Sequence, residues 1–404
     1  MFDVIIIGAG MAGLYTAYSI LERAPHTKLI ILERESYIGG RAGTDTYYDV
    51  PIVTGAGIGR LQKDHLLIDL MTRLKLPIQE FNVTHQYGCG VEVIDPVHVF
   101  FQLRDNYKNK PPQHRVTFKE YAISVIGKKG YDQFKIFAGF TDYEDEDAYD
   151  TLFYYGFEDN IMEWKGFSVP WAELVKRMVS SIGRQRIRVD CPVTKITRRS
   201  TTFIVQLNDT QIRSRKVVLA TTINTVTKLV HVHTKLYKGI KGQPFLRVYG
   251  KFTPSSEEIM KKLVSRTTIV DSILQKILPI GKGVYMISYS DNKNAIELLP
   301  HCKNNYEQRQ FFCRLLEQSL CLPRRTLELV SIRSYFWSIG THYYTPNPTG
   351  LTRLSMVHRL QRPLPGMFVV GEMISMNQGW VEGALESVNK VMNEIIKEVT
   401  SEVI

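Results

Sequence analysis

The stretch DVIIIGAGMAG, residues 3–13, decides the fold because it joins a strand to a glycine-rich turn. The run Asp3–Ile7 is rich in β-branched residues and shows no polar alternation, which is typical of a strand buried on both faces of a parallel sheet. Gly8, Gly10 and Gly13 follow in the spacing G-x-G-x-x-G, and an apolar helical pattern comes next. Such glycines let the backbone approach a dinucleotide pyrophosphate, whose charge faces the helix N-terminus.

The following segment supports the same interpretation. Residues 28–32 form a second apolar run that ends in Glu33, 20 residues beyond Gly13. An acid at this position accepts hydrogen bonds from the ribose hydroxyls of an adenosine. Because the strand, helix, second strand and acid come in the required order, the sequence predicts a dinucleotide-binding unit in an α/β, Rossmann-like fold.

The motif Gly39-Gly40-Arg41 follows six residues after the acid. Together with the glycine turn and Glu33, it resembles the FAD signature of the flavin-containing amine oxidase family. The resemblance implies that Arg41 contacts the pyrophosphate, a role that suits a planar, permanently charged guanidinium. The alternative is a turn with an incidental arginine. The family also runs its chain past the flavin ring near residues 55–60, which include Gly57 and Ile58.

A second signature lies near the C-terminus. An apolar run at 367–370 precedes Gly371-Glu372, and QGWVEGALES (378–387) then begins an amphipathic helix. A helix N-terminus at Val381 would stabilise negative charge on a reduced flavin. This stretch resembles the motif that members of the amine oxidase family commonly have near the C-terminus. The resemblance implies that Glu372 lies near the ribityl chain and that this last helix points at the flavin.

The resemblance also implies two aromatic side chains beside the flavin face. Trp380 takes one position, and the segment from Trp337 supplies Tyr343 as the other, with Tyr344 as the adjacent alternative; both rings could instead be core residues. Monoamine oxidases attach their flavin through a cysteine where this chain has His342, so non-covalent FAD is expected.

The family lysine near flavin N5 has no clear counterpart. The best alignment of residues 244–252 places Arg247 at that point, and Lys251 lies four residues further on the same side of an expected strand. An arginine stays protonated and cannot act as a base, although it could hold a water or a substrate carboxylate.

The resemblance extends over nearly the whole chain and implies a discontinuous FAD domain interleaved with an α+β substrate domain. Further strands are expected at 185–193, 203–207 and 216–222. The expected FAD-binding segments are 1–88, 185–235 and 346–404, and the expected substrate segments are 89–184 and 236–345. The residues expected at FAD are Gly8, Gly10, Met11, Ala12, Gly13, Glu33, Arg34, Gly40, Arg41, Gly57, Ile58, Val193, Trp337, Gly371, Glu372, Gly379, Trp380 and Val381.

Charge and cysteine content argue against several other classes of protein. The net charge is +11 over 404 residues, but the basic residues are scattered, which argues against nucleic-acid binding. Five cysteines without a CxxC pair suggest neither a disulfide framework nor a metal site. The chain shows no signal-peptide pattern and no apolar stretch of spanning length, so a reduced, cytoplasmic setting is expected. Acidic residues gather between Asp142 and Asp159, as a solvated face or as a funnel for a cationic amine.

These features predict an FAD-dependent oxidase that takes hydride from the carbon next to an amine nitrogen, with O2 reoxidising the flavin to give hydrogen peroxide. The catalytic candidates are Trp380, Tyr343, Arg247 and Lys251. An amino-acid oxidase stays open, as do a desaturase, a protoporphyrinogen oxidase-like protein and a non-catalytic flavoprotein. The expected partners are an amine and O2, and a homodimer is also considered.

Overall fold

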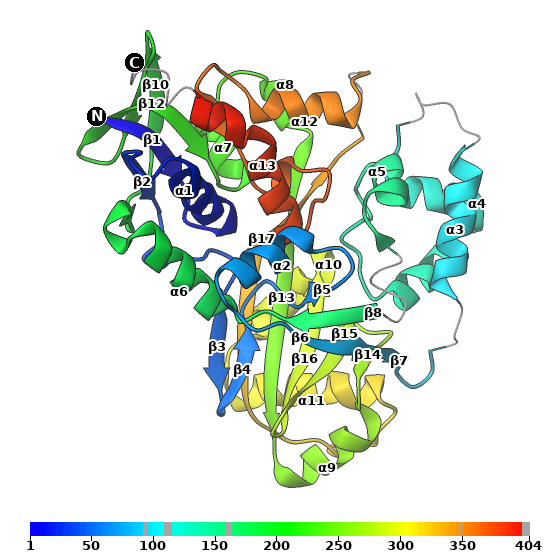
Figure 1. Ribbon diagram of the computed structural model, residues 1–404. Coiled ribbons are helices and arrows are strands. Elements are labelled where there is room, and N and C mark those ends of the chain that lie inside the picture. Colours follow the sequence, from blue (N-terminus) through cyan, green and yellow to red (C-terminus); the bar gives the residue numbers. More distant parts are fainter. Residues whose placement is uncertain (92–94, 109–114, 158–163, 347–349, 398–404) are drawn as a thin grey trace.

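The computed structural model describes residues 1–91, 95–108, 115–157, 164–346 and 350–397, and it is built around two large sheets (Figure 1). The first sheet has seven strands in the order β10-β11-β12-β1-β2-β9, with β18 paired to β12. Its strands are β1 (Phe2–Ile7), β2 (Leu29–Leu32), β9 (Ile187–Arg188), β10 (Lys195–Arg199), β11 (Thr202–Gln206), β12 (Gln211–Leu219) and β18 (Met367–Val369).

The centre of this sheet is parallel, as the sequence predicted. β1 pairs in parallel with β2 and β12, and β18 pairs in parallel with β12, so the first and last parts of the chain share one sheet. The strand expected over 185–193 is only two residues long. Strand β10, which pairs antiparallel with β11, was not predicted. The predicted α/β Rossmann-like class is confirmed.

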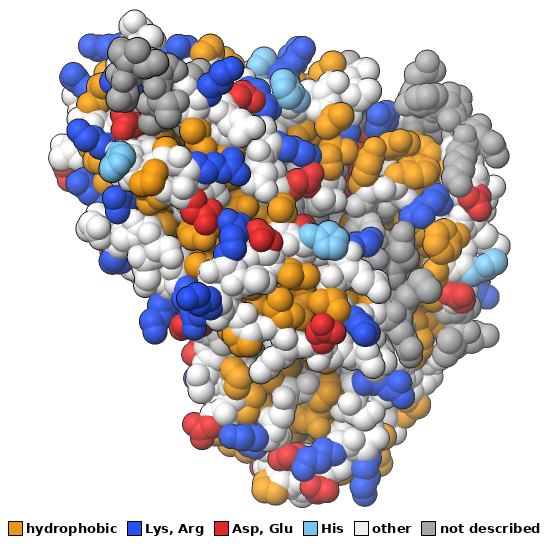
Figure 2. All heavy atoms as spheres, in the orientation of Figure 1, with side chains coloured by type: hydrophobic (Ala, Val, Ile, Leu, Met, Phe, Trp, Pro, Cys, Tyr) orange, Lys and Arg blue, Asp and Glu red, His pale blue; other side chains and the backbone are white. Residues whose placement is uncertain are grey.

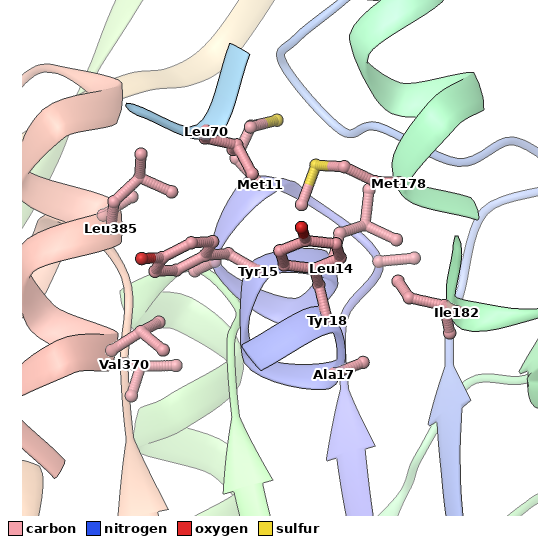
Figure 3. Close-up of a cluster of buried hydrophobic side chains, with 14 of the residues drawn as sticks. Met11, Leu14, Tyr15, Ala17, Tyr18, Leu70, Met178, Ile182, Val370 and Leu385 are labelled. Atoms are coloured by element: carbon pink, nitrogen blue, oxygen red, sulfur yellow. The ribbon is translucent and has the colours of Figure 1, made fainter. Parts of the chain in front are cut away.

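Four helices pack together on one face of this sheet. Figure 3 shows Leu14, Tyr15 and Tyr18 of the first helix between Met178 of a second helix and Leu385 of the last. The helices are α1 (Met11–Arg23), α2 (His65–Arg73), α6 (Trp171–Ile182) and α13 (Val381–Lys397). The opposite face is covered by α7 (Ile223–Leu229), α8 (Thr234–Tyr237) and α12 (Arg353–Gln361).

The second sheet has six strands in the order β17-β13-β16-β15-β14-β7. Strand alternation sorts the side chains of β13: Leu246 and Val248 pack in a core with the helices, whereas Phe245, Arg247 and Tyr249 face a cavity. The strands are β7 (His85–Tyr87), β13 (Ile240–Phe252), β14 (Thr267–Ile269), β15 (Lys276–Gly281), β16 (Val284–Asp291) and β17 (Leu329–Tyr344), and the helices are α9 (Pro254–Leu263), α10 (Asn292–Leu298) and α11 (Tyr306–Ser319).

Smaller elements complete the molecule. The helices α3 (Pro96–Lys108), α4 (Phe118–Ala138) and α5 (Ala148–Phe153) form a separate group with an aromatic core at one side of the molecule (Figure 1). Two small sheets pair β3 (Thr44–Tyr47) with β4 (Val50–Val53), and β8 (Trp164–Ser168) with β5 (Gly59–Arg60) and β6 (Gln79–Val83).

The packing of two elements differs from the expected division of the chain. Helix α6 lies within residues 89–184, assigned to the substrate domain, yet it packs on α1 in the core of the first sheet. Strand β7 lies within residues 1–88, assigned to the FAD domain, yet it pairs with β14 in the second sheet. Each of these two elements therefore packs in the other layer from the one expected for its segment of the chain.

One expectation about the cysteines is wrong. Cys89, just after β7, and Cys321, just after α11, form a disulfide across 232 residues of sequence, with their Cα atoms 5.7 Å apart. The odd number of cysteines and their irregular spacing gave no sign of it, because such a pairing depends on the tertiary fold alone. Cys191, Cys302 and Cys313 are free thiols.

The surface carries charges of both signs. In Figure 2, Lys and Arg side chains are spread over the face shown and are mixed with acidic, apolar and uncharged groups. Among the described helices, none combines the length and the apolar character needed to cross a lipid bilayer.

Replacing Cys321 by serine removes the disulfide. We expect the protein to lose about 2–5 kcal/mol of stability under oxidising conditions, because the cross-link restricts the unfolded chain. Thermal or denaturant unfolding of both proteins measures the loss. With a reductant present, the wild type should approach the variant; equal stability of the two under oxidising conditions would contradict the expectation.

Candidate active site

A cavity of about 1500 Å³ lies between the first sheet and the second. It collects nearly all of the residues expected at FAD, although they come from distant parts of the sequence. The predicted residues that line it are Gly8, Gly10, Met11, Ala12, Glu33, Arg34, Gly40, Arg41, Gly57, Ile58, Val193, Trp337, Gly371, Glu372, Gly379, Trp380, Val381 and Arg247. Gly13, Tyr343 and Lys251 are not among its lining residues.

The glycine turn shows why each glycine is present. A Cβ on Gly13 would lie 1.9 Å from the carbonyl oxygen of Gly8, and Gly8 itself has a positive φ of 106°, so both are required by the packing of strand on helix. A Cβ on Gly10 would have no described protein atom within 4 Å. Gly10 therefore keeps space open toward the cavity, as a turn that cradles a ligand does.

The N-terminus of α1 faces this open space. Its N-cap residue is Gly10, which supplies no side-chain cap, and Met11 and Ala12 line the cavity. The first backbone N–H groups of a helix lack partners within the helix and attract anions. The uncapped helix end and the open glycine fit the diphosphate of a dinucleotide.

The carboxylate of Glu33 is fixed at the cavity wall by two backbone groups. Its oxygens accept hydrogen bonds from the N–H of Ala9 (2.7 Å) and of Glu35 (2.9 Å). The backbone N–H of Cys191 donates to the carbonyl oxygen of Glu33 (2.8 Å), which places the loop with Val193 beside it. Glu33, expected at the adenosine ribose, and Val193, expected at FAD, therefore come from neighbouring segments.

Arg41 lies beside the glycine turn and pairs with Glu372. The N–H of Gly39 donates to the carbonyl oxygen of Ala9 (2.9 Å), which joins the two glycine motifs. The Arg41 guanidinium is 2.9 Å from Glu372 Oε1 and remains about one third exposed. A guanidinium beside the glycine turn suits a diphosphate, and the ion pair with Glu372 fixes the position of the Arg41 side chain.

Glu372 also binds His342 and the backbone of Gly379. His342 Nε2 accepts from the N–H of Ile223 (3.3 Å), so the proton lies on Nδ1, which donates to Glu372. The N–H of Gly379 donates to the other carboxylate oxygen (3.2 Å). Burial opposes the charged form of Glu372, but His342 and Arg41 outweigh it and lower its pKa to about 2. The carboxylate is thus ionised throughout the physiological range.

The Gly-Trp pair near the C-terminus fixes one wall of the cavity. Trp380 Nε1 donates to Asp64 Oδ2 (2.8 Å), and its ring meets that of Trp171 edge-on. Glu382 accepts hydrogen bonds from the N–H groups of Leu66 and Leu67 and so caps the first turn of α2. The stretch WVE therefore ties the last helix to α2.

The small residues that follow Glu382 have separate roles. A Cβ on Gly383 would lie 1.9 Å from the carbonyl oxygen of Asn377, so this glycine admits the chain's own backbone. Ala384, the next residue, lines the cavity.

The second sheet supplies two buried cations to the opposite wall. Arg247 is 6% exposed and lies over the Tyr289 ring, 4.1 Å from its centroid. Lys276, on β15, is also 6% exposed and lies over the Phe140 ring. Burial lowers the pKa of Lys276 to about 7, although Asp291 and Asp142 nearby favour its charged form.

Lys276 is a buried lysine of the cavity that the sequence did not reveal. Lys251, the candidate from the alignment, donates to the carbonyl oxygen of Lys282 and lies 3.8 Å from Glu257. It belongs to the same strand as Arg247 but lies beyond the part that lines the cavity. The only signal for Lys276 was a lysine at the start of an apolar run, which many strands share.

Tyr343 lines a smaller pocket beside the cavity, together with acidic residues of the segment singled out in the sequence. Glu146, Asp147 and Asp150 of that segment are buried. A solvated acidic face is therefore wrong for these three, because α5 and its flanking turns fold the carboxyl groups inward. Glu158 and Asp159 lie outside the described residues.

The fold and the cavity define a Rossmann-like protein with a second layer that closes over a dinucleotide site. The model of a Rossmann-like NAD(P)-binding domain matches residues 6–74, and the model of the flavin-containing amine oxidoreductases matches residues 102–395. The chain therefore belongs to the family of flavin-containing amine oxidoreductases. Membership confirms the family and the flavin cofactor that the sequence predicted.

Solved structures support the same fold. Cyclohexylamine oxidase from Brevibacterium oxydans aligns with a TM-score of 0.79 and 16% identity, covering 98% of this chain and 99% of that one. Putrescine oxidase bound to putrescine aligns with a TM-score of 0.77 and 14% identity over the same shares.

Two sequence relatives each match this chain over 39 residues. The FAD-containing monooxygenase EthA of Mycolicibacterium smegmatis is 49% identical there, and the uncharacterized protein R188 of Acanthamoeba polyphaga mimivirus is 38% identical. Each match covers 10% of this chain and 8% of the relative.

Replacing Gly10 by alanine tests the cradle. The added methyl group meets no described protein atom, so the apoprotein should unfold at the wild-type temperature, whereas FAD affinity should fall about tenfold or more. Titration of apoprotein with FAD measures the affinity. Gly13→Ala is the contrasting variant and should destabilise the apoprotein itself. Wild-type FAD affinity in Gly10→Ala would contradict the assignment.

Proposed function

We propose that this protein is an FAD-dependent oxidase of amines, which converts an amine and O2 to an imine and hydrogen peroxide. The observation that carries the proposal is a cavity whose lining includes the uncapped N-terminus of α1, Trp380, Arg247 and Lys276. A family of flavin-containing amine oxidoreductases supplies the reaction class. Putrescine oxidase and cyclohexylamine oxidase, which share the fold, act on the amines in their names.

The first sheet and α13 would hold the cofactor. The turn at Gly10 and Arg41 would bind its diphosphate, Glu33 its adenosine ribose, and the segment from Gly371 to Val381 its flavin end. Bound FAD would supply the acceptor for the hydride that leaves the carbon next to nitrogen. The protein side chains orient the amine, exclude water and control its proton.

Three residues, Trp380, Lys276 and Tyr343, would act on the substrate. The indole of Trp380 is fixed by its bond to Asp64 and presents a rigid apolar surface for an alkyl amine. Lys276, neutral above about pH 7, would accept the proton of an incoming ammonium and leave the amine nitrogen with its lone pair. Tyr343, from its place in the side pocket, would contact the substrate away from the reacting carbon.

An amino-acid substrate is the second candidate, and Arg247 favours it. Among the residues that the structure describes, no carboxylate forms an ion pair with this buried guanidinium, whose Nη1 is 3.6 Å from Met286 Sδ. A substrate carboxylate could pair with it in a bidentate manner.

The function is tested in two steps. The absorption spectrum of the purified protein should show bound FAD, and peroxide release should follow the addition of a monoamine, a diamine or an L-amino acid from a panel. Activity limited to amino acids would favour the second candidate. A flavin-containing protein that releases no peroxide and is not reduced by any member of the panel would contradict both.

The rate should also depend on the protonation of Lys276. Its pKa is lowered to about 7, so the side chain loses its proton as the pH rises through 7, and kcat/KM should rise over that range. Lys276→Met should abolish this inflection, and Lys251→Met should retain it.

Asp142 faces Lys276 and titrates in the same range, because burial, together with Asp291, raises its pKa to about 7. Asp142→Asn separates the two groups. Loss of the carboxylate should shift the inflection to lower pH if it belongs to Lys276, since the ammonium loses a favourable charge. Disappearance of the inflection in Asp142→Asn, with its retention in Lys276→Met, would contradict the assignment.

A further inference from the structure

The side pocket that contains Tyr343 adjoins the large cavity. Asp142, Tyr155, Thr341 and Gln378 line both, so the two spaces share a wall. The side pocket has a volume of about 20 Å³, which is room for one water-sized group. A substrate whose chain passes between these shared residues would place a single small group in the side pocket.

Two buried acceptors in this pocket have no hydrogen-bond donor among the described residues. Asp150 is 3% exposed, and its Oδ2 binds the guanidinium of Arg353 while its Oδ1 has no donor. Gln378 Nε2 donates to the carbonyl oxygen of Met373 (2.9 Å), which fixes the amide and leaves its Oε1 without a donor. Buried acceptors are costly to leave unpaired, so the pocket favours a ligand rich in donors.

The charge of the pocket points the same way. Its described lining has three carboxyl groups, from Asp142, Glu146 and Asp150, against the one guanidinium of Arg353. Burial raises the pKa of Asp150 to about 6, although Arg353 opposes it, and burial together with the charge of Asp150 raises the pKa of Glu146 well above its usual range. A single guanidinium therefore cannot balance the three carboxyl groups, and an added cation would stabilise their charged forms.

We propose that this acidic side pocket binds a second, terminal ammonium group of the substrate, so that the preferred substrate carries two amino groups on one alkyl chain. A primary ammonium has three N–H donors and no acceptor, which matches the open oxygens of Asp150 and Gln378. The tyrosine side chains at Tyr154, Tyr155 and Tyr343 add aromatic surface around the cation. The inference rests on the proposed function for the reacting amine at the other end.

Two classes of substrate, diamines and diamino acids, carry a terminal alkylammonium group. A diamine such as putrescine presents it on a plain chain, and a diamino acid such as L-ornithine presents it together with a carboxylate for Arg247. Each has a partner without the terminal nitrogen, which is butylamine for putrescine and L-norvaline for L-ornithine. The two pairs therefore measure the same pocket and distinguish the two sources.

The test uses the FAD-loaded enzyme and the ratio of kcat/KM between the members of each pair. In the wild type, the ratio should favour the substrate with the terminal ammonium. Glu146→Gln keeps the size of the side chain and its acceptor for the Thr151 hydroxyl (2.8 Å) but cannot become charged. A bound ammonium would favour the charged form of Glu146, which glutamine cannot adopt, so we expect this variant to lower the ratio about tenfold or more through the loss of one charge-assisted hydrogen bond. An unchanged ratio overturns the proposal.

Asp145→Asn is the matched control. Asp145 is the adjacent acid in the chain, but it is exposed and does not line the pocket, so its variant should keep the wild-type ratio. A fall of the same size in Asp145→Asn would show general attraction by the acidic segment and would overturn the proposal. The FAD spectrum and melting temperature of each variant establish that it is folded.

A binding measurement separates this inference from the proposed function. If no amine releases peroxide, the oxidase proposal fails, but the pocket can still be tested by the melting temperature of the holoenzyme with putrescine or butylamine. A larger rise with putrescine that disappears in Glu146→Gln supports the pocket. Equal rises with both amines overturn it.

Discussion

A single buried carboxylate, that of Glu372, joins the parts of the chain that form the active site. It binds Arg41 from the second glycine motif, His342 from the long strand β17 of the second sheet, and the backbone of Gly379 before the last helix. Its partners are separated from it by 331, 30 and 7 residues. Removing one partner of such a buried group leaves the others without compensation, so these contacts act as a unit.

The sequence predicted the nucleotide layer well because its constraints are local. A buried strand, a glycine turn and an acid 20 residues later must follow one another to form the unit, so their order is visible in residues 3–33. The GGR and GWVEG motifs could be read in the same way from the family resemblance. Most residues expected at FAD indeed line the cavity, and Gly13 differs because it supports the turn from behind.

The substrate layer was harder to predict because its cavity residues come from alternate positions of separate strands. Arg247 and Lys276 face the cavity through the pairing of β13, β16 and β15, which no local pattern records. The disulfide between Cys89 and Cys321 and the inward carboxyl groups of Glu146 and Asp150 depend on tertiary contacts in the same way. A charge cluster in a sequence does not show which way its side chains point.

The uncapped N-terminus of α1 has a consequence for the protein in a cell. A ligand that binds only the folded state stabilises it by a term that grows with ligand concentration, about 4 kcal/mol at a thousandfold excess over Kd. Since the first turn of α1 has no side-chain cap and faces the cavity, the dinucleotide contributes to the folding of the layer that binds it. The amount of this enzyme that survives quality control should then follow the flavin supply of the cell, so that vitamin status sets its abundance as well as its activity.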